Sequence, residues 1–371
     1  MFHNYKFKNL DVKLIIAVIT LTIIGIFVIG SANEANQQKQ ILGMILGIFV
    51  MAGMALLDYD FLLHFHWVYY FLVLGLLASV LLFGEKSGGA TRWIDVGIRF
   101  QPSELAKILL ILFFAWFFMM HEEDINKPKT LAITIALSML PLLLIEKEPD
   151  LSTTIVTMMI ICVMIFVTGV SYKLVGAVLG VTVPGIVLLL FLVTREGQTI
   201  LDEYQGLRIL AWLKPDEYPA SSYQQQNSIM AIGSGQLLGK GLGNQAFDSV
   251  KNGNYISEPH TDFIFAVAGE ELGFVGSALI IILIFFITIE ILMIAKNAKD
   301  IAGKLICIGM AALIGFQSFV NICVVTGLMP NTGLPLPFVS YGLTSLVTVY
   351  FGIGIVLNVG LQSKNNNGRL F

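Results

Sequence analysis

The 371-residue chain is far more apolar than a soluble protein of its length. Hydrophobic residues make up 56% of it and charged residues only 13%, whereas soluble domains carry about 25% charged residues. The net charge is −3 with no long basic segment, which argues against nucleic acid as a partner. The three cysteines lie in apolar stretches without metal-ligand spacing, so they indicate packing residues. The composition therefore predicts an integral membrane protein.

Apolar segments recur along the chain at lengths that suit membrane helices. A hydrocarbon core about 30 Å thick requires roughly 20 apolar residues per helix. Such segments occur near residues 14–32, 40–57, 65–84, 103–120, 130–145, 153–169, 174–194, 262–294, 303–327 and 340–361. The first is long and lacks a convincing cleavage site, so we interpret it as a retained helix. We predict an all-α integral membrane protein with about ten transmembrane helices, forming one polytopic domain over residues 1–371.

The lysines and arginines between these segments indicate the orientation of the chain. Short cytoplasmic loops carry an excess of both residues, and long loops are left out of the count. The side with both termini has 11, at Lys6, Lys8, Lys13, Lys127, Lys129, Lys173, Lys296, Lys299, Lys304, Lys364 and Arg369. The other side has 5, at Lys39, Lys86, Arg92, Arg99 and Lys147. Both termini are therefore predicted to be cytoplasmic, and residues 195–261 to form a large extracytoplasmic loop between helices 7 and 8.

Glu104 and Lys107 are charged residues at the start of the fourth predicted helix. Pro102 suits a first helical position, and Glu104 meets the positive end of the helix dipole. Lys107, however, lies about 8 Å into the helix, and ionisable residues at membrane depth mark functional sites by default. Two structural explanations compete with a functional one: an ion pair at i, i+3 spacing, and a lysine that reaches back to the interface.

Acidic residues and one histidine surround the start of the eighth predicted helix. Asp262 stands at the helix start and fits a helix cap. A cap does not account for Glu258 and His260 beside it, nor for Glu270 and Glu271, which we expect two turns deeper. Partial burial raises the pKa of an aspartate toward the value that suits a general base. Four carboxylates and an imidazole therefore exceed what a cap needs, and Asp262 is the one at the helix mouth.

Other unusual segments carry weaker signals. The charge cluster 146–150 fits an ordinary interfacial loop. The glycines of 233–235 and 239–243 allow backbone N–H groups to approach an anion closely, although the pattern is no Walker motif. The segment 330–338 is too rich in proline to continue a helix. At membrane depth such irregular backbone is tolerated only against protein or a water-filled cavity.

Together these motifs resemble the SEDS family (shape, elongation, division and sporulation), which includes RodA and FtsW. The resemblance covers nearly the whole chain. It rests on Arg92-Trp93-Ile94, Gln101-Pro102-Ser103-Glu104 with Lys107, Pro149-Asp150-Leu151, Gly233-Ser234-Gly235, Gly239-Lys240-Gly241, His260-Thr261-Asp262-Phe263-Ile264-Phe265, Gly269-Glu270-Glu271-Leu272-Gly273, Pro330, Gly333, Leu336-Pro337-Phe338 and Ser340-Tyr341-Gly342. Ser152, Ser257 and Leu343 depart from the family pattern, and Ser257 lies beside the proposed site. Residues 204–215 look closer to RodA than to FtsW.

The resemblance implies a peptidoglycan glycosyltransferase that polymerises lipid II at the outer face of the bacterial cytoplasmic membrane, supporting cell shape and elongation. It implies a class B penicillin-binding protein as partner transpeptidase, and Asp262 matches the essential aspartate of the family. Cations are needed to stabilise the leaving diphosphate, and the candidates are Arg92, Lys107, Arg208 and Lys240. The supporting or substrate-binding candidates are Glu104, Glu258, His260 and Ser340. The one cofactor considered is a divalent cation, Mg²⁺ or Mn²⁺.

Two other classes of protein stay open at the level of sequence. A flippase or transporter of lipid-linked precursors also contains intramembrane charges and broken helices. Its site would lie near the bilayer midplane between inverted repeats, whereas here the ionisable residues gather toward the outer side and no repeat is evident. A membrane scaffold for a partner enzyme would need no carboxylate cluster. The distribution of charge therefore favours an enzyme.

Overall fold

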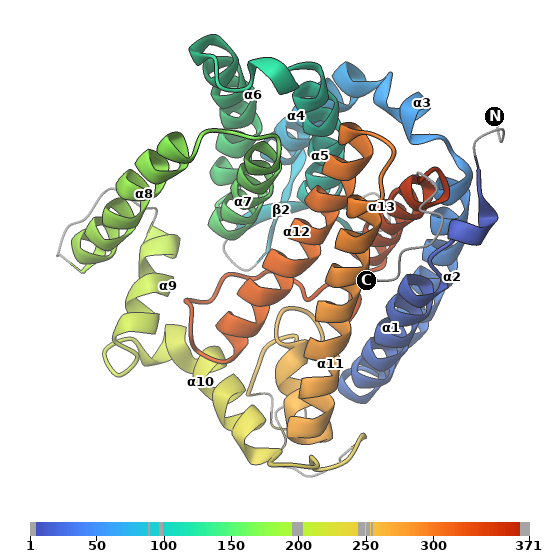
Figure 1. The fold of residues 1–371 in the computed structure, drawn as a ribbon. Coiled ribbons are helices and arrows are strands. Elements are labelled where there is room, and N and C mark those ends of the chain that lie inside the picture. Colours follow the sequence, from blue (N-terminus) through green and yellow to red (C-terminus); the bar gives the residue numbers. More distant parts are fainter. Residues whose placement is uncertain are drawn as a thin grey trace.

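The computed structural model describes residues 5–87, 90–95, 99–194, 203–243, 249, 253 and 255–363. Its elements in chain order are η1 (Phe7–Asn9), α1 (Val12–Ala32), α2 (Glu34–Leu56), α3 (Tyr59–Leu63), α4 (His66–Phe83), β1 (Glu85–Ser87), β2 (Ala90–Asp95), β3 (Arg99–Phe100), α5 (Pro102–Met120), η2 (Glu122–Asp124), α6 (Pro128–Lys147), α7 (Leu151–Val167), α8 (Tyr172–Val193), α9 (Glu203–Leu213), α10 (Pro219–Ser234), α11 (Ile264–Lys296), α12 (Ile301–Val325) and α13 (Leu343–Leu361) (Figure 1). Lys364, Arg369 and, within the predicted loop 195–261, residues 195–202, 244–248, 250–252 and 254 lie outside the described residues.

The prediction of an all-α, multi-span membrane protein is confirmed. Each of the ten predicted segments overlaps one long helix: α1, α2, α4 to α8, and α11 to α13. Within the described residues, eight of these helices are long and apolar enough to cross a membrane. The 17 residues of α7 and the stretch Tyr172–Thr182 of α8 are apolar but shorter. A small antiparallel sheet in the order β1-β2-β3 is an addition that the hydropathy pattern did not predict.

The second and the last membrane helices, α2 and α13, pack together through glycines. A Cβ atom on Gly47 of α2 would lie 2.8 Å from the ring of Tyr350 in α13, and one on Gly354 would lie 2.6 Å from the carbonyl oxygen of Met51. Small residues let membrane helices approach this closely. The central helices are α5, α12 and α13, in which 72–78% of the spanning residues are buried, against 22% in α4. The core therefore joins segments from both ends of the chain.

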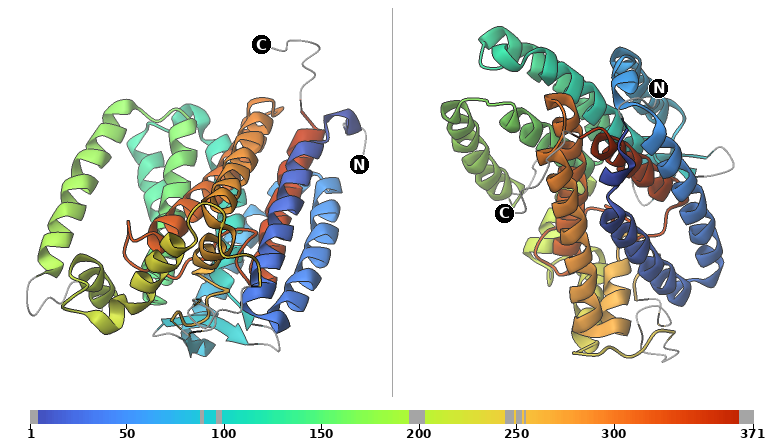
Figure 2. Two further views of the ribbon diagram at one scale, coloured as in Figure 1. Left: turned by 90° about the horizontal axis from the view of Figure 1, so that it is seen from below. Right: turned by 45° about the vertical axis from the view of Figure 1, so that its right-hand side comes forward.

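The two ends of the helix bundle differ in character. The sheet, α9 and α10 lie toward one end, which we call the loop end (Figure 2, left). At the opposite end, which we call the terminal end, the backbone N–H of Lys6 donates to the carbonyl oxygen of Leu361 at 3.0 Å. The described beginning and end of the chain therefore lie on the same side, as an even number of crossings requires.

α11 is two helical arms joined at Gly273. This residue has φ 66° and ψ −163°, a conformation outside the helical region. A straight helix of 33 residues would be about 50 Å long, well beyond the hydrocarbon core of about 30 Å. The right-hand view of Figure 2 shows the short, pale-orange first arm beside the longer second arm. The chain therefore reverses direction at Gly273.

The contacts of the first arm give its direction. Near its start, the Ser340 hydroxyl donates to the carbonyl oxygen of Thr261, and the carbonyl oxygen of Ser340 accepts from Gln40. Gln40 lies six residues, about 9 Å, inside the loop-end terminus of α2. At the end of the arm, Glu271 accepts a hydrogen bond from Ser31, the second-last residue of α1. The expectation that Glu270 and Glu271 lie two turns deeper than Asp262 is therefore wrong, because the arm runs outward.

The glycine-rich loop packs against this reversal. A Cβ atom on Gly235 would lie 2.0 Å from the carbonyl oxygen of Gly269, and one on Gly239 2.2 Å from that of Glu271. The backbone N–H groups of Lys240 and Gly241 donate to the carbonyl oxygens of Glu270 and Glu271 at 2.9 and 3.0 Å. These donors close the end of the first arm. Gly235 and Gly239 therefore serve close backbone packing here, and the N–H groups of Lys240 and Gly241 are engaged by carbonyl oxygens of the chain.

Candidate active site

Gly333 marks the point where three charged side chains converge. A Cβ atom on this glycine would lie 3.2 Å from Arg92 Nη1, 3.2 Å from Asp262 Oδ2 and 3.9 Å from Arg208 Nη1. Arg92 and Asp262 are therefore separated by no more than twice 3.2 Å. The three side chains come from β2, from the loop before α11 and from α9, so segments far apart in the chain meet at one place. We call Arg92, Asp262 and Arg208 the convergent triad.

The backbone around Asp262 is held by α12 and by the proline-rich segment 330–338. The Asn321 side chain donates to the carbonyl oxygens of Asp262 and Leu334 at 2.8 and 2.7 Å. Ser340, through its hydroxyl, accepts from the Leu336 N–H at 2.7 Å and donates to Thr261 at 2.8 Å. Ser340 is thus a positioning residue, and it ties the irregular segment to the loop that carries Asp262.

The cap explanation of Asp262 does not fit its placement. α11 begins at Ile264, its N-cap residue is Phe263, and no side chain makes a capping hydrogen bond there. The carboxylate instead faces the two arginines of the convergent triad, and its Oδ2 lies near Gly333. Its position is therefore not explained by helix stability.

Arg92 is anchored by the segment between α6 and α7. Its Nη2 donates to the carbonyl oxygen of Pro149 at 2.7 Å, and its Nε lies 3.4 Å from Asp150 Oδ2. Asp150 is 1% exposed and also accepts from the N–H of Thr153. Glu148 beside it is fully buried, and burial raises its pKa to about 9, with the charge of Asp150 adding to the rise and that of Arg92 opposing it. The interpretation of residues 146–150 as an ordinary interfacial loop is therefore wrong.

Arg208 reaches the triad from α9. Its guanidinium lies over the ring of Tyr204 at 4.3 Å and donates to the carbonyl oxygen of Asn331 at 3.3 Å. Burial lowers the pKa of Arg208, while the charge of Asp262 raises it, but an arginine keeps its proton at neutral pH. Trp212, one turn on, donates to the carbonyl oxygen of Gly327 at 2.9 Å. The contacts of Arg208 and Trp212 thereby fix α9 against the segment between α12 and α13, so Arg208 is held facing Asp262.

The electrostatics of Asp262 suit a base. Burial raises its pKa from 3.8 to about 6, and the charges of Arg92 and Arg208 oppose the rise. Glu258 is exposed and adds a small upward contribution. His260 packs against the ring of Tyr341 at 5.4 Å, and burial lowers its pKa. Asp262 is therefore ionised at neutral pH yet retains a useful affinity for a proton.

Glu104 and Lys107 form a buried ion pair beneath the proline-rich segment. Lys107 Nζ donates to Glu104 Oε1 at 2.8 Å and to Gln317 Oε1 at 2.6 Å, and the lysine is 1% exposed. Gln317 in turn donates to the carbonyl oxygen of Pro335 at 3.0 Å. Arg92 and Arg208, not Lys107, are the cations that act on Asp262. Lys107 therefore supports the segment that carries Gly333, and it reaches Asp262 only through that backbone.

Lys240 belongs to a different cluster. Its Nζ pairs with Glu270 Oε1 at 2.8 Å, and Ser31 donates to Glu271 at 2.6 Å. These residues fasten the glycine-rich loop to the outward end of the first arm of α11. The structure thus brings together Arg92, Arg208 and Asp262 from the sequence-based candidates, with Ser340, Glu104 and Lys107 in support, and sets Lys240 apart.

The described residues do not fit a protein-bound divalent cation. In the part of the chain that the structure describes, no group of three or more His, Cys, Asp or Glu side chains is arranged to hold a metal ion. The carboxylate of Asp262 faces two arginines, whose charges already complement its own. A requirement of the reaction for Mg²⁺ or Mn²⁺ therefore stays a prediction.

Comparisons with known proteins identify the relatives of this chain. The probable peptidoglycan glycosyltransferase FtsW of Geobacter sulfurreducens is 32% identical over 381 residues, which cover 97% of each chain. The peptidoglycan glycosyltransferase MrdB of Escherichia coli K12 is 33% identical over 363 residues, 96% of this chain and 95% of that protein. Because FtsW and MrdB match about equally, the preference for a RodA-like subfamily stays a prediction.

Solved structures agree with the sequence relatives. A chain of a peptidoglycan synthase complex, described as coordinating polymerization and crosslinking, superposes with a TM-score of 0.76 at 28% identity, covering 96% of this chain and 98% of that one. The rod shape determining protein RodA of Thermus thermophilus gives a TM-score of 0.69 at 26% identity, covering 98% and 99%. The family model for FtsW, RodA and SpoVE, described as "Cell cycle protein", matches residues 10–365. The chain therefore belongs to the FtsW/RodA/SpoVE family of cell cycle proteins.

Proposed function

We propose that this protein is a peptidoglycan glycosyltransferase that polymerises lipid II, as its relatives' names suggest. The observation that carries the proposal is the convergent triad, in which a half-buried carboxylate faces two arginines beside a glycine. A lipid-linked diphosphate sugar needs both kinds of group: a base for the incoming hydroxyl and cations for the outgoing diphosphate. The similarity to a rod shape determining protein supports a role in cell shape and elongation through wall synthesis.

The triad suggests a direct displacement. Asp262 takes the proton of the acceptor sugar hydroxyl, and the electron pair of that oxygen forms the bond to the anomeric carbon of the donor. The bond from this carbon to the diphosphate breaks, and its electron pair leaves with the lipid diphosphate. Arg92 and Arg208 stabilise the charge that develops on the leaving oxygens. A divalent cation bound to that diphosphate is compatible with this scheme, but none of its steps requires one.

A lipid transporter is the competing function. Its substrate site would lie near the bilayer midplane, whereas Thr261, next to Asp262, lies level with Gln40, about 9 Å from the loop-end terminus of α2. Purified protein supplied with lipid II separates the alternatives. A polymerase yields glycan strands, a transporter moves lipid across a vesicle membrane without joining it, and a scaffold does neither. Failure to form polymer, with and without Mg²⁺ or Mn²⁺, would refute the proposal.

The pH profile of polymerisation is expected to follow the ionisation of Asp262. Its pKa of about 6 lies above that of an ordinary aspartate because the group is buried. The base works only without its proton, so the rate should rise as the pH increases through about 6 and level off above 7. The measurement is the initial rate of glycan formation between pH 5 and 8, with protein integrity checked at each pH. A rate that stays flat across this range would argue against Asp262 as the base.

We also propose that the loop end faces the outside of the bacterial cytoplasmic membrane and that both termini face the cytoplasm. The lysine and arginine count supports this orientation. Cysteine introduced at Ala220, an exposed residue of α10, is expected to react with an impermeant thiol reagent in intact cells. Cysteine at Glu123, exposed at the terminal end, is expected to react only after lysis. The reverse pattern would overturn the orientation.

The partner is proposed to be a class B penicillin-binding protein. The similarity to a chain from a complex that coordinates polymerization and crosslinking supports a partnership of this kind. Many large apolar side chains on the outer helices are exposed, including Phe49, Phe71 and Phe285 at 64–72%. A single-span partner is expected to bind such lipid-facing helices through apolar contacts and close packing.

A further inference from the structure

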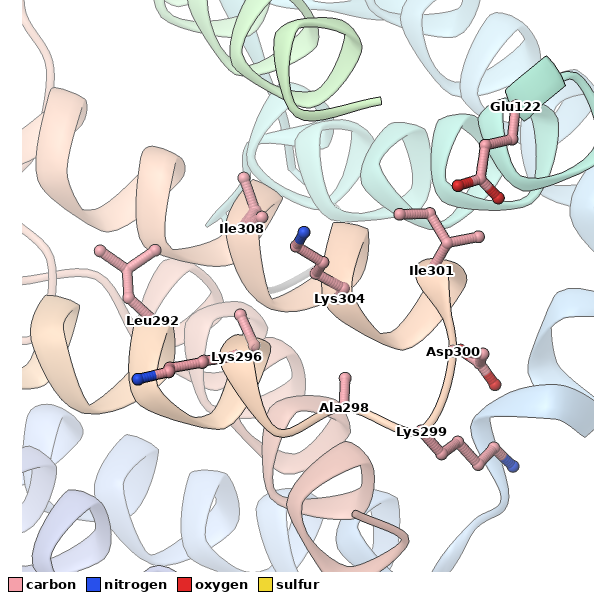
Figure 3. Close-up of a pocket in the computed structure, with 10 residues that line it drawn as sticks. Glu122, Leu292, Lys296, Ala298, Lys299, Asp300, Ile301, Lys304 and Ile308 are labelled. Atoms are coloured by element: carbon pink, nitrogen blue, oxygen red, sulfur yellow. The ribbon is translucent and has the colours of Figure 1, made fainter. Parts of the chain in front are cut away.

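A cavity of about 680 Å³ lies at the terminal end of the bundle, on the opposite side from the convergent triad (Figure 3). It is formed where α11 ends and α12 begins, and Glu122 of η2 borders it. Its volume falls within the range of sites that hold a small molecule or a lipid headgroup. The glycosyltransfer scheme makes no use of it.

Two charged residues of the cavity are already engaged in the fold. Lys299 donates to Asp60 and to Gln362. Asp300 accepts from the Tyr59 hydroxyl at 2.7 Å and caps the N–H of Gly303 at 2.8 Å. In Figure 3 both side chains point away from Lys296 and Lys304. These two residues therefore have structural roles and add little to the cavity.

Lys296 and Lys304 are the cations available to a ligand. Among the described contacts no hydrogen bond or ion pair engages either ammonium group, and both line the cavity. Lys304 lies in the first turn of the 25-residue α12, where a positive charge opposes the helix dipole. Helix stability therefore does not explain Lys304, whereas an anion beside a helix start would be stabilised by both the lysine and the helix.

The other lining residues indicate that the ligand is amphipathic. Leu292 lies one turn before Lys296 in α11 and is 45% exposed, whereas Ile308, one turn beyond Lys304 in α12, is 7% exposed and forms the floor of the cavity. Both residues lie farther into the membrane-spanning parts of their helices than the two lysines do. A soluble anion would gain nothing from this apolar side. A phospholipid would place its headgroup at the lysines and an acyl chain along the exposed leucine.

We propose that this cavity binds an anionic phospholipid, with the phosphate held between Lys296 and Lys304. The site lies at the level where α11 leaves the membrane, which is the level of the headgroups. Glu122 lines the same cavity and repels the anion, so the net attraction comes from two lysines against one carboxylate. An excess of lysine on one side of a membrane protein also sets its orientation, but orientation does not require that the lysines share a cavity.

The test compares lipid binding by matched variants of the whole protein. Phosphatidylglycerol is titrated onto the purified protein, with phosphatidylcholine as reference, and bound lipid is counted by native mass spectrometry. The double variant K296Q/K304Q is expected to bind phosphatidylglycerol about 25-fold more weakly, since each lysine contributes about fivefold. E122Q is expected to bind it more tightly. The control K129Q/K173Q removes the same charge from exposed positions outside the cavity and should bind as the parent does.

Two results would overturn the proposal. One is equal loss of binding in K296Q/K304Q and K129Q/K173Q, which would indicate a diffuse charge effect. The other is binding of glycerol 1-phosphate as strong as that of the whole lipid, which would make the site one for a soluble phosphate. Polymerisation of lipid II by each variant is measured alongside, because the cavity is remote from Asp262 and its loss should leave the chemistry intact.

Discussion

Replacing Asp262 with asparagine is expected to lower lipid II polymerisation by about 100-fold or more, because the amide keeps the shape of the side chain but cannot accept the proton. Membrane insertion and partner binding should be unchanged. The measurement is polymer yield over time from purified Asp262→Asn protein. A variant that polymerises at nearly the parental rate would remove Asp262 from the mechanism.

Thermal stability supplies the control for this experiment. Burial raises the pKa of Asp262 to about 6 in the folded protein, so the folded state holds the proton more tightly than the unfolded chain does. As the pH rises from about 4 to about 6, the contribution of Asp262 therefore lowers the free energy of unfolding, and the lower value persists above that range. The Asp262→Asn protein is therefore expected to melt at the parental temperature or above it at pH 7.5. A cap residue is recognised with a second variant, because asparagine caps about as well as aspartate, whereas Asp262→Ala would then lose about 1 kcal/mol of stability.

Replacing Gly333 with alanine is expected to reduce polymerisation by about tenfold, although alanine adds only a methyl group. That carbon would lie 3.2 Å from both Arg92 Nη1 and Asp262 Oδ2, so each of these side chains would have to shift by a few tenths of an ångström. Gly333 also has φ +76°, which strains any residue with a side chain. The measurement is the rate of glycan formation together with the melting temperature.

Gly169→Ala is the matched control for Gly333→Ala. Gly169 has φ +95°, and a Cβ atom there meets nothing within 4 Å, so alanine carries the backbone strain without the crowding. Both variants should lose a similar amount of stability, while only Gly333→Ala should lose activity. If the two lose activity equally, the effect of Gly333→Ala comes from strain and the crowding argument fails.

Sequence reasoning worked best where the information lies within one segment. Hydropathy located the membrane helices, and a carboxylate at a helix mouth pointed to Asp262. It failed where the meaning of a residue depends on a distant partner. Asp150 looked like part of a surface loop because nothing in residues 146–150 reveals that Arg92 from β2 packs against it.

Other misses arose from reading a helix as straight. The run from Ile264 to Lys296 is apolar apart from three glutamates, so it was read as one helix across Gly273, and Glu271 was assigned the wrong depth. Gln317 and Asn321 did leave a signal that was overlooked. They are polar residues four apart in an apolar helix, and that spacing places both on one face of α12. Such a pair can be sought in other sequences.

The distribution of the site along the chain has a consequence for biosynthesis. Gln40, from the second helix to leave the ribosome, holds Ser340 and the N–H of Gly342, which are among the last residues before the final helix. Ser340 in turn holds the loop that carries Asp262. Contacts across 300 positions form only after both partners have been made, and they are slow because a long intervening chain must be ordered. The polymerising centre therefore assembles only after Ser340 has been made, so a chain synthesised only as far as α12 cannot yet hold Asp262 in place.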